Sequence, residues 1–373
     1  MYNRNGHILG MSISYEPNHG AYIDTECVDE KAEKLLQQLF DKKRVVFHNA
    51  KFDLHFFEYH FNFKFPRFED TMLLHYMLDE NPGTHGLKQL SLKYTPYGDY
   101  EKPMYDWMDD YRKRNGMLKG DFTWDLIPFD VMKHYAALDA VCTFLLFQKF
   151  ETPLLKNDRL YGVYRDILIP GCRFLTDIQD IGVPFDRMRL EKSSVLMQEN
   201  IDEAIATLYT YPEIKKFEEI TKKDFNPNST MQLRSLLFDY IGLTPTGKKT
   251  GTGADSTDAE VLKELAEEHE VPQLVLDIRQ KVKIKSTYLD KIYPQLDRDS
   301  RLRTGFNLHG TTSGRLSSSG KMNMQQIPRD NPIVKGCIKA APGNKIVAMD
   351  LTTAEVYCCL LYTSDAADDS LRV

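Results

Sequence analysis

The chain contains no run of about 20 apolar residues, which is the length that a transmembrane helix needs. Its first ten residues are too polar for a signal peptide, and no internal repeat is present. The six cysteines form no Cys-x-x-Cys pair, which argues against a zinc site and favours a reducing compartment. These absences exclude membrane, disulfide-scaffold and repeat proteins.

The composition that is present is ordinary for a folded protein. Hydrophobic residues make up 42% of the sequence and charged residues 27%. At 373 residues the chain exceeds what one hydrophobic core usually organises. We therefore expect two or three domains.

The charge is unevenly distributed. Between Ile278 and Lys345, 14 Lys and Arg stand against four Asp, so this segment carries +10. Because the whole chain has a net charge of −6, the remainder carries −16. A strongly basic segment of this kind attracts a polyanion such as nucleic acid, with a solvated lysine-rich face as the structural alternative.

The first 150 residues have the pattern of an α/β domain. Extended, β-branched or alternating segments predict strands at 8–15, 21–23 and 44–47. Apolar residues at helical spacing predict helices at 31–40, at 70–78 with Asp70 as N-cap, and at 128–150.

After Pro153 the pattern becomes helical. Helices are predicted at 167–181, ending at Gly182, and at 188–208, 231–240 and 272–296. Ser229 with Gln232 and Thr257 with Glu260 are predicted to form capping boxes, and 247–253 is predicted to be a loop. From Arg303 the chain is extended and rich in turns, and 345–349 is predicted to be a buried strand.

Two pairs of polar residues stand four positions apart on predicted helices. Asn49 and Asp53 follow the strand at 44–47, and Tyr135 and Asp139 lie within the helix at 128–150. Residues at i and i+4 share one face of a helix, so each pair can point at one site. A carboxylate can hold a metal ion while a neighbouring phenol orients a water nucleophile. An exposed Asp beside a half-buried Tyr is the structural alternative for the second pair taken alone.

A third group lies in the basic segment. The stretch 312–318 places a glycine before Arg315, which lets the backbone approach closely and the guanidinium fork into a groove edge. Three side-chain amides that can clamp bases and sugars follow at Asn323, Gln325 and Gln326. Asp350 ends the predicted strand at 345–349, where a carboxylate can hold Mg²⁺ and bridge it to substrate phosphates.

These residues resemble the motifs of family A DNA polymerases, the bacterial DNA polymerase I type, in a phage-like variant. The polymerase signatures are Ser313-Gly-Arg-Leu-Ser-Ser, Asn323-Met-Gln-Gln-Ile-Pro, and Asp350 with Glu355. The two upstream pairs resemble the second and third motifs of the family's 3′–5′ proofreading exonuclease. The stretches Phe225-Asn-Pro-Asn-Ser and Lys283-Ile-Lys-Ser-Thr-Tyr288 resemble its thumb.

The resemblance implies an α/β fold in the first domain, an RNase H-like exonuclease with a mixed sheet and helices. An α-rich thumb and the beginning of an α+β palm would follow. We expect the exonuclease-like domain at 1–150, the helical linker and thumb at 151–300, and the start of the polymerase palm at 301–358.

The resemblance also implies roles in the exonuclease-like domain. Asp53 and Asp139 would hold divalent metals, with Tyr135 on the attacking water and Asn49 on the DNA strand. The implied cofactor is Mg²⁺ in two-metal sites, which are incomplete in this chain. The implied location is the cytoplasm, that of the host if the protein is viral.

In the polymerase part, Asp350 would be one of two catalytic carboxylates that hold Mg²⁺, and Glu355 would line the nucleotide-sugar pocket. Arg315 would reach the minor groove at the primer end. The remaining implied DNA contacts are Lys281, Lys283 and Lys285 on duplex phosphates and the amides of Asn323, Gln325 and Gln326. The implied partners are primer–template DNA and deoxynucleoside triphosphates, and the sequence identifies no processivity factor.

Part of the family pattern is missing. The first exonuclease motif, Asp-x-Glu, belongs before the strand at 8–15, and Asp24-Thr25-Glu26 imitates it only 29 residues before Asp53, so we interpret it as a strand-end turn. Beyond Glu355 neither the fingers motif nor the second palm carboxylate is found. Residues 359–373 resemble a translated library adapter, so its Asp365, Asp368 and Asp369 are not expected to bind metal. We therefore expect a fragment that is inactive or nearly so.

Two other interpretations stay open. A stand-alone 3′–5′ exonuclease of the DEDD type would explain the pairs at Asn49/Asp53 and Tyr135/Asp139, but it leaves 313–328 and Asp350 without a role. A non-catalytic DNA-binding module would explain the basic segment. Degradation, extension or salt-sensitive binding of a primer separates the three.

Overall fold

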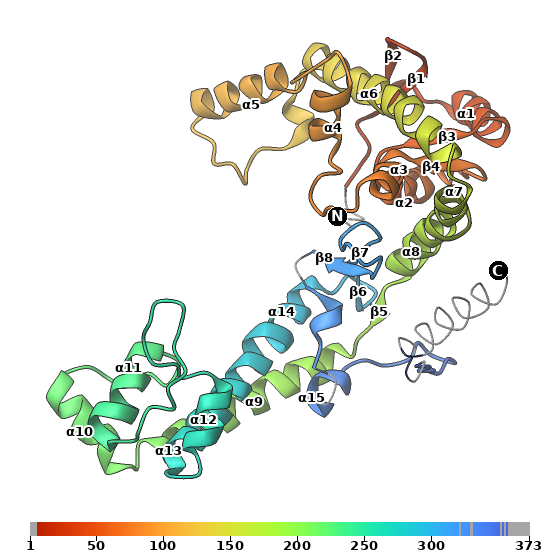
Figure 1. Cartoon of the computed structure of the whole chain (residues 1–373). Helices are drawn as coiled ribbons and strands as arrows, with labels where there is room; N and C mark the ends of the chain where they lie inside the picture. The colour runs from red at the N-terminus through yellow and green to blue at the C-terminus, as the bar shows by residue number, and fades with distance from the viewer. Residues whose placement is uncertain (1–5, 321, 329–330, 351–352, 354–355, 357–373) are drawn as a thin grey trace, which may run out of the picture.

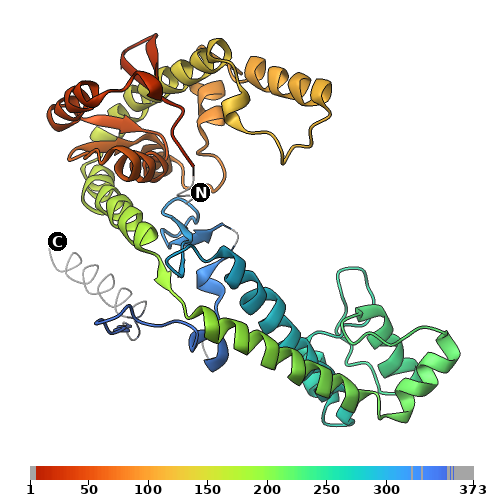
Figure 2. The same ribbon diagram turned by 180° about the vertical axis from the view of Figure 1, so that it is seen from behind.

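The computed structural model describes residues 6–320, 322–328, 331–350, 353 and 356. Within them the chain is elongated, with an N-terminal unit of strands and helices at one end and a helical tip at the other (Figure 1). Long helices join the two ends, as the view from behind also shows (Figure 2). No helix in this part of the chain is long and apolar enough to cross a membrane.

The N-terminal unit contains two small sheets. The strands β1 (Gly10–Glu16) and β2 (His19–Asp24) form an antiparallel hairpin, whereas β3 (Val45–Phe47) and β4 (Phe68–Asp70) are parallel. Six helices complete the unit: α1 (Glu30–Lys42), α2 (Ala50–Phe61), α3 (Thr71–Leu78), α4 (Leu87–Tyr94), α5 (Lys102–Asn115) and α6 (Phe129–Leu155). The predicted strands and helices of this region are confirmed, and so is the N-cap at Asp70, whose side chain accepts the Met72 N–H.

The long helix α6 organises the unit because it packs against the β1–β2 hairpin on one side and α3 and α4 on the other. Leu146 and Phe150 of α6 are buried in one core with Leu54 of α2 and Leu74 of α3. Burying such side chains stabilises the fold by about 2 kcal/mol each. This packing fixes where α2 and α6 present their polar side chains.

Beyond α6 the chain is mainly helical. First come α7 (Asp158–Val163), a π-helical turn at 164–168 and α8 (Ile169–Ile181), which ends at Gly182. Gly182 has a φ of 67°, a conformation that favours glycine, so the predicted helix end is confirmed. The helix α9 (Arg187–Leu208) runs to the tip, and α13 (Glu270–Lys283) returns beside it.

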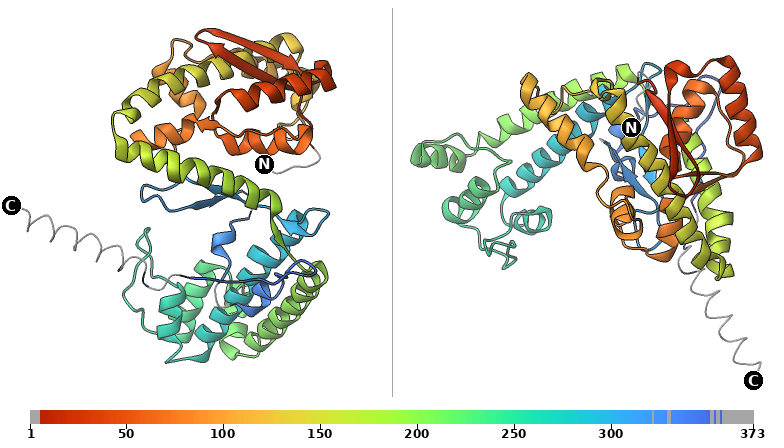
Figure 3. Two further views of the ribbon diagram at one scale, coloured as in Figure 1. Left: turned by 90° about the vertical axis from the view of Figure 1, so that its right-hand side faces the viewer. Right: turned by 90° about the horizontal axis from the view of Figure 1, so that it is seen from above.

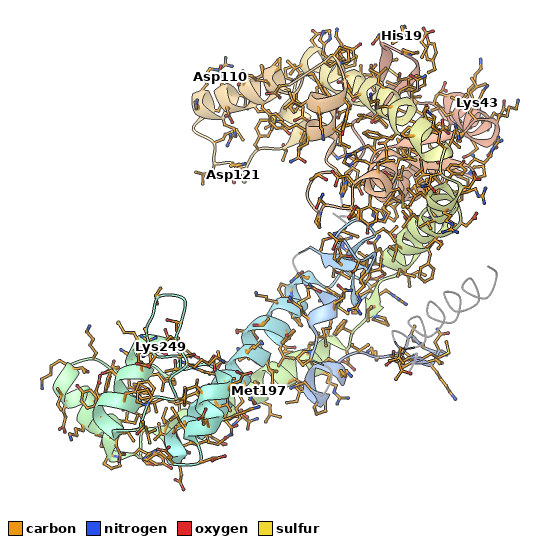
Figure 4. All side chains as sticks on the ribbon, in the orientation of Figure 1. His19, Lys43, Asp110, Asp121, Met197 and Lys249 are labelled. Carbon is orange, nitrogen blue, oxygen red and sulfur yellow. The ribbon has the colours of Figure 1, made fainter. Side chains whose placement is uncertain are left out.

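The tip encloses a hydrophobic core of its own. It is built from α10 (Pro212–Thr221), α11 (Thr230–Ser235), a π-helical turn at 236–241 and α12 (Ala259–Leu265). Figure 4 shows Met197 along α9 and Lys249 on the tip loop, far from His19 and Lys43 in the N-terminal unit. The tip therefore lies at a distance from the polar residues of α2 and α6.

The return path leads back to the N-terminal unit. After α13 come a π-helical turn at 284–289 and α14 (Asp290–Ile292), and then β6 (Arg301–Leu302), which pairs with β5 (Val183–Pro184). The strands β7 (Gly305–Asn307) and β8 (Ser317–Ser319) form an antiparallel hairpin, and α15 (Pro332–Lys335) follows. Figure 3 shows α8 running between the N-terminal unit and the rest of the chain.

The β7–β8 hairpin docks onto the N-terminal unit, and we call these contacts the hairpin seam. The Phe306 N–H donates to Gln179 Oε1 at 2.6 Å, and the Phe306 carbonyl accepts the Lys51 ammonium. Tyr76 Oη donates to the Thr311 carbonyl at 2.7 Å. Residues more than 200 positions apart in the sequence thus meet here.

Several expectations differ from the structure. The predicted strand at 345–349 is wrong, because no described strand pairs with it and Ile346 and Met349 are 61% and 92% exposed. The N-cap of α12 is Asp258, not Thr257, because the Asp258 carboxylate accepts the N–H groups of Glu260 and Val261. The helices α4, α5 and α10 were not predicted.

The hairpin seam is expected to weaken in acid. Burial lowers the pKa of His48 to about 3 and that of His309 to about 4, with neighbouring histidines adding repulsion. Because these folded-state values lie below the unfolded value, the stabilisation is complete above pH 6.5 and is lost as the pH falls. Hydrogen exchange of the Phe306 amide should show a loss of about 4 kcal/mol of protection between pH 7 and 5, about half from each histidine.

The matched variant is His309→Gln, which should remove roughly half of this pH dependence. The amides of the β1–β2 hairpin, which carry no such cluster, serve as the internal reference. Equal pH dependence at Phe306 and in the reference amides would contradict the prediction.

Candidate active site

The first predicted pair lies where β3 passes into α2. Asn49 is the N-cap of α2 and has a φ of 65°, a left-handed conformation that asparagine tolerates. Asp53 lies in the first turn of α2 and is half-buried. The strand-to-helix setting that the sequence predicts is therefore confirmed.

The buried carboxylate of Asp70 holds the turn between β3 and α2 in place. The sequence pattern predicted Asp70 only as the N-cap of α3. Asp70, at the end of β4, accepts the N–H of Asn49 at 3.0 Å, of Ala50 at 2.8 Å and of Met72 at 2.9 Å. It thereby satisfies backbone donors at the starts of both α2 and α3. Its signal in the sequence, an Asp before a helix, indicated the α3 cap but not the contact with α2.

The second predicted pair lies in the first half of α6. The carboxylate of Asp139 accepts hydrogen bonds from the hydroxyls of Tyr100 and Tyr135. Burial raises the pKa of both phenols, so they stay protonated at neutral pH and act as donors. Tyr100 and the neighbouring buried Glu101 belong to a turn without periodicity, which is why the sequence did not reveal them.

The structure brings the two pairs together. Burial, followed by the charges of Asp70 and Asp139, raises the pKa of Asp53 to about 7. Burial also raises the pKa of Asp139 to about 6, against the lowering effect of the two phenols. Two carboxyl groups on different helices thus share one electrostatic environment and titrate close to neutral pH.

Such a pair fits a divalent cation. Mg²⁺ prefers oxygen ligands and is commonly held by one or two carboxylates together with water and substrate phosphates. A cation bound by Asp53 and Asp139 would favour the charged form of both carboxyl groups and so offset the burial that raises their pKa values. In the described part of the chain no set of three or more His, Cys, Asp or Glu is arranged as a complete metal cage.

The segment Asp24-Thr25-Glu26, which resembles an Asp-x-Glu motif, has a structural explanation. Asp24 ends β2 and caps the short turn at 25–27, where its carboxylate accepts the Glu26 N–H at 2.9 Å. A capping role accounts for this carboxylate.

The predicted DNA-contacting loop joins β7 to β8. Arg315 is exposed on this loop, and its carbonyl accepts the Thr311 hydroxyl at 2.7 Å. Gly314 has a φ of 74°, which explains the glycine before the arginine. The loop holds Arg315 at the surface beside the hairpin seam.

The three predicted amides have different surroundings. The Asn323 side chain accepts the Gln325 N–H at 2.9 Å, and Gln325 Nε2 donates to the Leu316 carbonyl at 3.0 Å. The Gln325 amide therefore ties the Arg315 loop to the turn at 324–326, which Asn323 caps. The Gln326 side chain is exposed, while its carbonyl accepts the Tyr288 hydroxyl at 2.7 Å.

The predicted lysines lie where α13 passes into the following π-helical turn. Lys283 is exposed and Lys281 is half-buried, whereas the Lys285 ammonium lies 2.8 Å from the carboxylate of Asp290. Asp350 is exposed in the extended segment after α15. Glu355 lies outside the described residues.

The Tyr100 hydroxyl is expected to control the acidity of Asp139. In Tyr100→Phe the carboxylate loses one donor that favours its charged form, so its pKa should rise by about 1 unit above the wild-type value. Carbon-13 NMR titration of the aspartate carboxyl groups measures this shift. Tyr97→Phe, which removes a hydroxyl bonded to Asn18 instead, is the control, and an equal shift in both variants would contradict the assignment.

Two protein-family models match two different parts of the chain. Residues 2–155 match the 3′-5′ exonuclease model, and residues 196–366 match the DNA polymerase family A model. The solved POL domain of Pol1 from M. smegmatis, in complex with DNA primer–template and dNTP, superposes with a TM-score of 0.64 at 23% identity. That superposition covers 87% of this chain and 50% of the solved chain, and it supports the fold.

Curated relatives agree with the family models. The DNA polymerase of Escherichia phage T5 is 50% identical over 98% of this chain, and DNA polymerase I of Rhizobium leguminosarum is 33% identical over 78%. The chain spans 44% of the first protein and 27% of the second. The chain therefore belongs to DNA polymerase family A and carries a 3′–5′ exonuclease segment ahead of its polymerase segment.

Proposed function

We propose that the chain acts on primer–template DNA, with a 3′–5′ exonuclease-type site in an RNase H-like domain at 1–150. A thumb at 151–300 and the start of a palm at 301–358 would grip the duplex for template-directed nucleotidyl transfer from deoxynucleoside triphosphates. The separate hydrophobic cores of the N-terminal unit and of the tip support a first domain distinct from a helical one. The cores cross the proposed boundaries, because Leu175 packs into the first core and a third core joins Leu190 to Val334. The cytoplasm is the proposed location.

The observation that carries the exonuclease proposal is the proximity of two carboxyl groups, Asp53 on α2 and Asp139 on α6, which is close enough for the charge of Asp139 to act on Asp53. Both residues would hold Mg²⁺, which supplies an activated water and neutralises charge on the scissile phosphate. Tyr135, protonated because burial raises its pKa, would orient the water through its hydroxyl. Asn49, at the start of the same helix as Asp53, would contact the DNA strand.

The polymerase proposal depends on the exposed groups around the β7–β8 hairpin and α13. Arg315 would enter the minor groove at the primer end, and Gln326 would contact the strand beside it. Gln325 would act mainly by holding the loop through the Leu316 carbonyl, and Asn323 by capping the turn that carries Gln325. Lys281 and Lys283 would bind duplex phosphates, with a smaller share from Lys285 because Asp290 already pairs with it.

The proposed metal and nucleotide groups of the palm are Asp350 for Mg²⁺ and Glu355 for the nucleotide sugar. Since the described residues contain no set of three or more side chains arranged to hold a metal ion, we expect hydrolysis to be slow. The stand-alone exonuclease interpretation is disfavoured, because residues 196–366 match the polymerase family.

A primer labelled at its 5′ end and annealed to a template tests the proposal. With Mg²⁺ and no nucleotides, shortening of the primer from its 3′ end that disappears in Asp139→Asn supports the exonuclease site. Salt-sensitive binding that weakens in Arg315→Ala supports the polymerase-type contact. Tight binding that neither Arg315→Ala nor the lysine variants alter would contradict it.

A further inference from the structure

A partly open cavity lies at the hairpin seam, and Asn49 is the only residue of its lining to which the proposed exonuclease and polymerase chemistry gives a role. Its volume is about 210 Å³, and it lies between the start of α2 and the β7–β8 hairpin. This volume is smaller than the ~300–1,000 Å³ pockets of drug-sized ligands, so a phosphate with part of a sugar fits and a dinucleotide does not.

The charge of this cavity comes from Lys51. Its ammonium donates to the Phe306 carbonyl and to Gln179 Oε1, both of which are neutral acceptors. The carboxylate whose charge acts on Lys51, Asp70, already accepts three backbone N–H groups. No ion pair to Lys51 is found in the described part of the chain, so its ammonium rests on these neutral acceptors alone. An anion in the cavity would compensate this charge.

The other polar groups of the lining are suited to the same ligand. They are the side-chain amides of Asn49 and Asn307, the Ser319 hydroxyl and the His309 imidazole. No carboxylate lines the cavity. Each of these groups can donate a hydrogen bond to a phosphate oxygen.

A buried donor without a partner lies beside the cavity. Gln179 is 1% exposed, and its Oε1 is occupied by the Phe306 N–H and Lys51 while its Nε2 has no hydrogen-bond partner. Buried polar groups are normally satisfied by protein or by a bound molecule. Gly305, which lines the cavity, allows the close approach of Ser319 on the paired strand, because a Cβ there would lie 2.6 Å from Ser319 Oγ.

We propose that the hairpin seam binds a phosphate group, either inorganic phosphate or the 5′-phosphate of a single nucleotide, on Lys51, Asn307 and Ser319. The bound phosphate would join the N-terminal unit to the hairpin, because Lys51 belongs to α2 and the other two residues belong to β7 and β8. If the proposed exonuclease function holds, the nucleoside monophosphate that it releases is one source of this ligand.

Isothermal titration calorimetry of the whole chain in EDTA tests the site without engaging metal ions. The probes are inorganic phosphate, deoxyadenosine monophosphate and deoxyadenosine. We expect one site that binds the first two and not the nucleoside. Binding of inorganic phosphate alone would assign the site to the free anion, still as proposed. Absence of phosphate binding, or equal binding of deoxyadenosine, would overturn the proposal.

Two variants locate the site. Lys51→Met should weaken phosphate binding at least tenfold. Asn307→Asp replaces the amide by a carboxylate of nearly the same shape opposite Lys51. It should also abolish phosphate binding without changing the melting temperature. Lys64→Met, an exposed lysine of the same unit, should change nothing. If phosphate binding were lost in Asp139→Asn but kept in Lys51→Met and Asn307→Asp, the anion would bind at the Asp53–Asp139 pair. That result would refute this inference alone and leave the proposed function intact.

Discussion

Replacing Asp53 by Asn is expected to stabilise the protein by about 2 kcal/mol at pH 8 and hardly at all near pH 4. At pH 8 the wild-type carboxyl must be ionised although burial and the charges of Asp70 and Asp139 oppose it. Asparagine has nearly the same shape and carries no charge. A buried carboxyl group that lowers the stability of its own protein is expected at a position where function requires the carboxyl group.

The direction of the pH dependence follows from proton binding. The folded-state pKa of Asp53, about 7, lies above its ordinary value of 3.8, so the folded protein holds the proton more tightly than the unfolded chain. The stabilisation from this proton is complete below pH 3.8 and is lost as the pH rises through about 7. The advantage of Asp53→Asn should therefore grow across this interval.

Urea denaturation in EDTA at pH 4, 6 and 8 measures the effect, with circular dichroism as the readout. Asp121→Asn, on the exposed loop after α5 (Figure 4), is the matched control and should be neutral at every pH. Adding Mg²⁺ should stabilise the wild type more than Asp53→Asn, because the cation compensates the charge only where a carboxylate is present. A variant that is less stable than the wild type at pH 8 would contradict the account.

The double variant Lys281→Ala/Lys283→Ala is expected to weaken binding of a primer–template duplex by about 10- to 30-fold at 0.1 M salt. Both lysines lie on the arm that returns from the tip, and neither has a carboxylate partner in the described part of the chain. The slope of log affinity against log salt should become shallower by about 2, since two phosphate contacts are lost.

Fluorescence anisotropy with a labelled duplex at several salt concentrations gives both quantities. Lys285→Ala is the internal control, because its ammonium pairs with Asp290 and should contribute less than threefold. Lys42→Ala/Lys43→Ala, at the exposed end of α1 in the N-terminal unit, removes the same charge elsewhere. If this second control weakened binding equally, the effect would be one of net charge rather than of the proposed contact.

The sequence predicted those features that depend on local spacing. The pairs Asn49/Asp53 and Tyr135/Asp139 could be found because i, i+4 spacing and a strand before a helix are visible in the sequence itself. Helix caps at Asp70 and Ser229 are likewise local, and the structure contains both. The Thr257 cap failed because Asp258, one residue later, is an equally good capping residue and bonds two N–H groups.

The features that were missed arise from contacts between distant segments. Tyr100 meets Asp139 across 39 residues, and Lys51 meets Phe306 across 255 residues. No periodicity or motif marks such pairs. The wrong strand at 345–349 has a related cause, because an apolar run predicts a strand only when neighbouring strands are available to pair with it. Among the described residues none is, and the run stays exposed.

The central claim is that Asp53 and Asp139 together hold a divalent cation beside a DNA strand end. Titration with Mn²⁺, followed by electron paramagnetic resonance, tests it directly in the presence of a single-stranded oligonucleotide. The account predicts that the affinity for Mn²⁺ falls at least tenfold in both Asp53→Asn and Asp139→Asn and is unchanged in Asp121→Asn. It also predicts that the bound Mn²⁺ broadens the NMR signals of the 3′-terminal nucleotide only. Mn²⁺ affinity that survives both substitutions, or broadening spread evenly along the oligonucleotide, would contradict it.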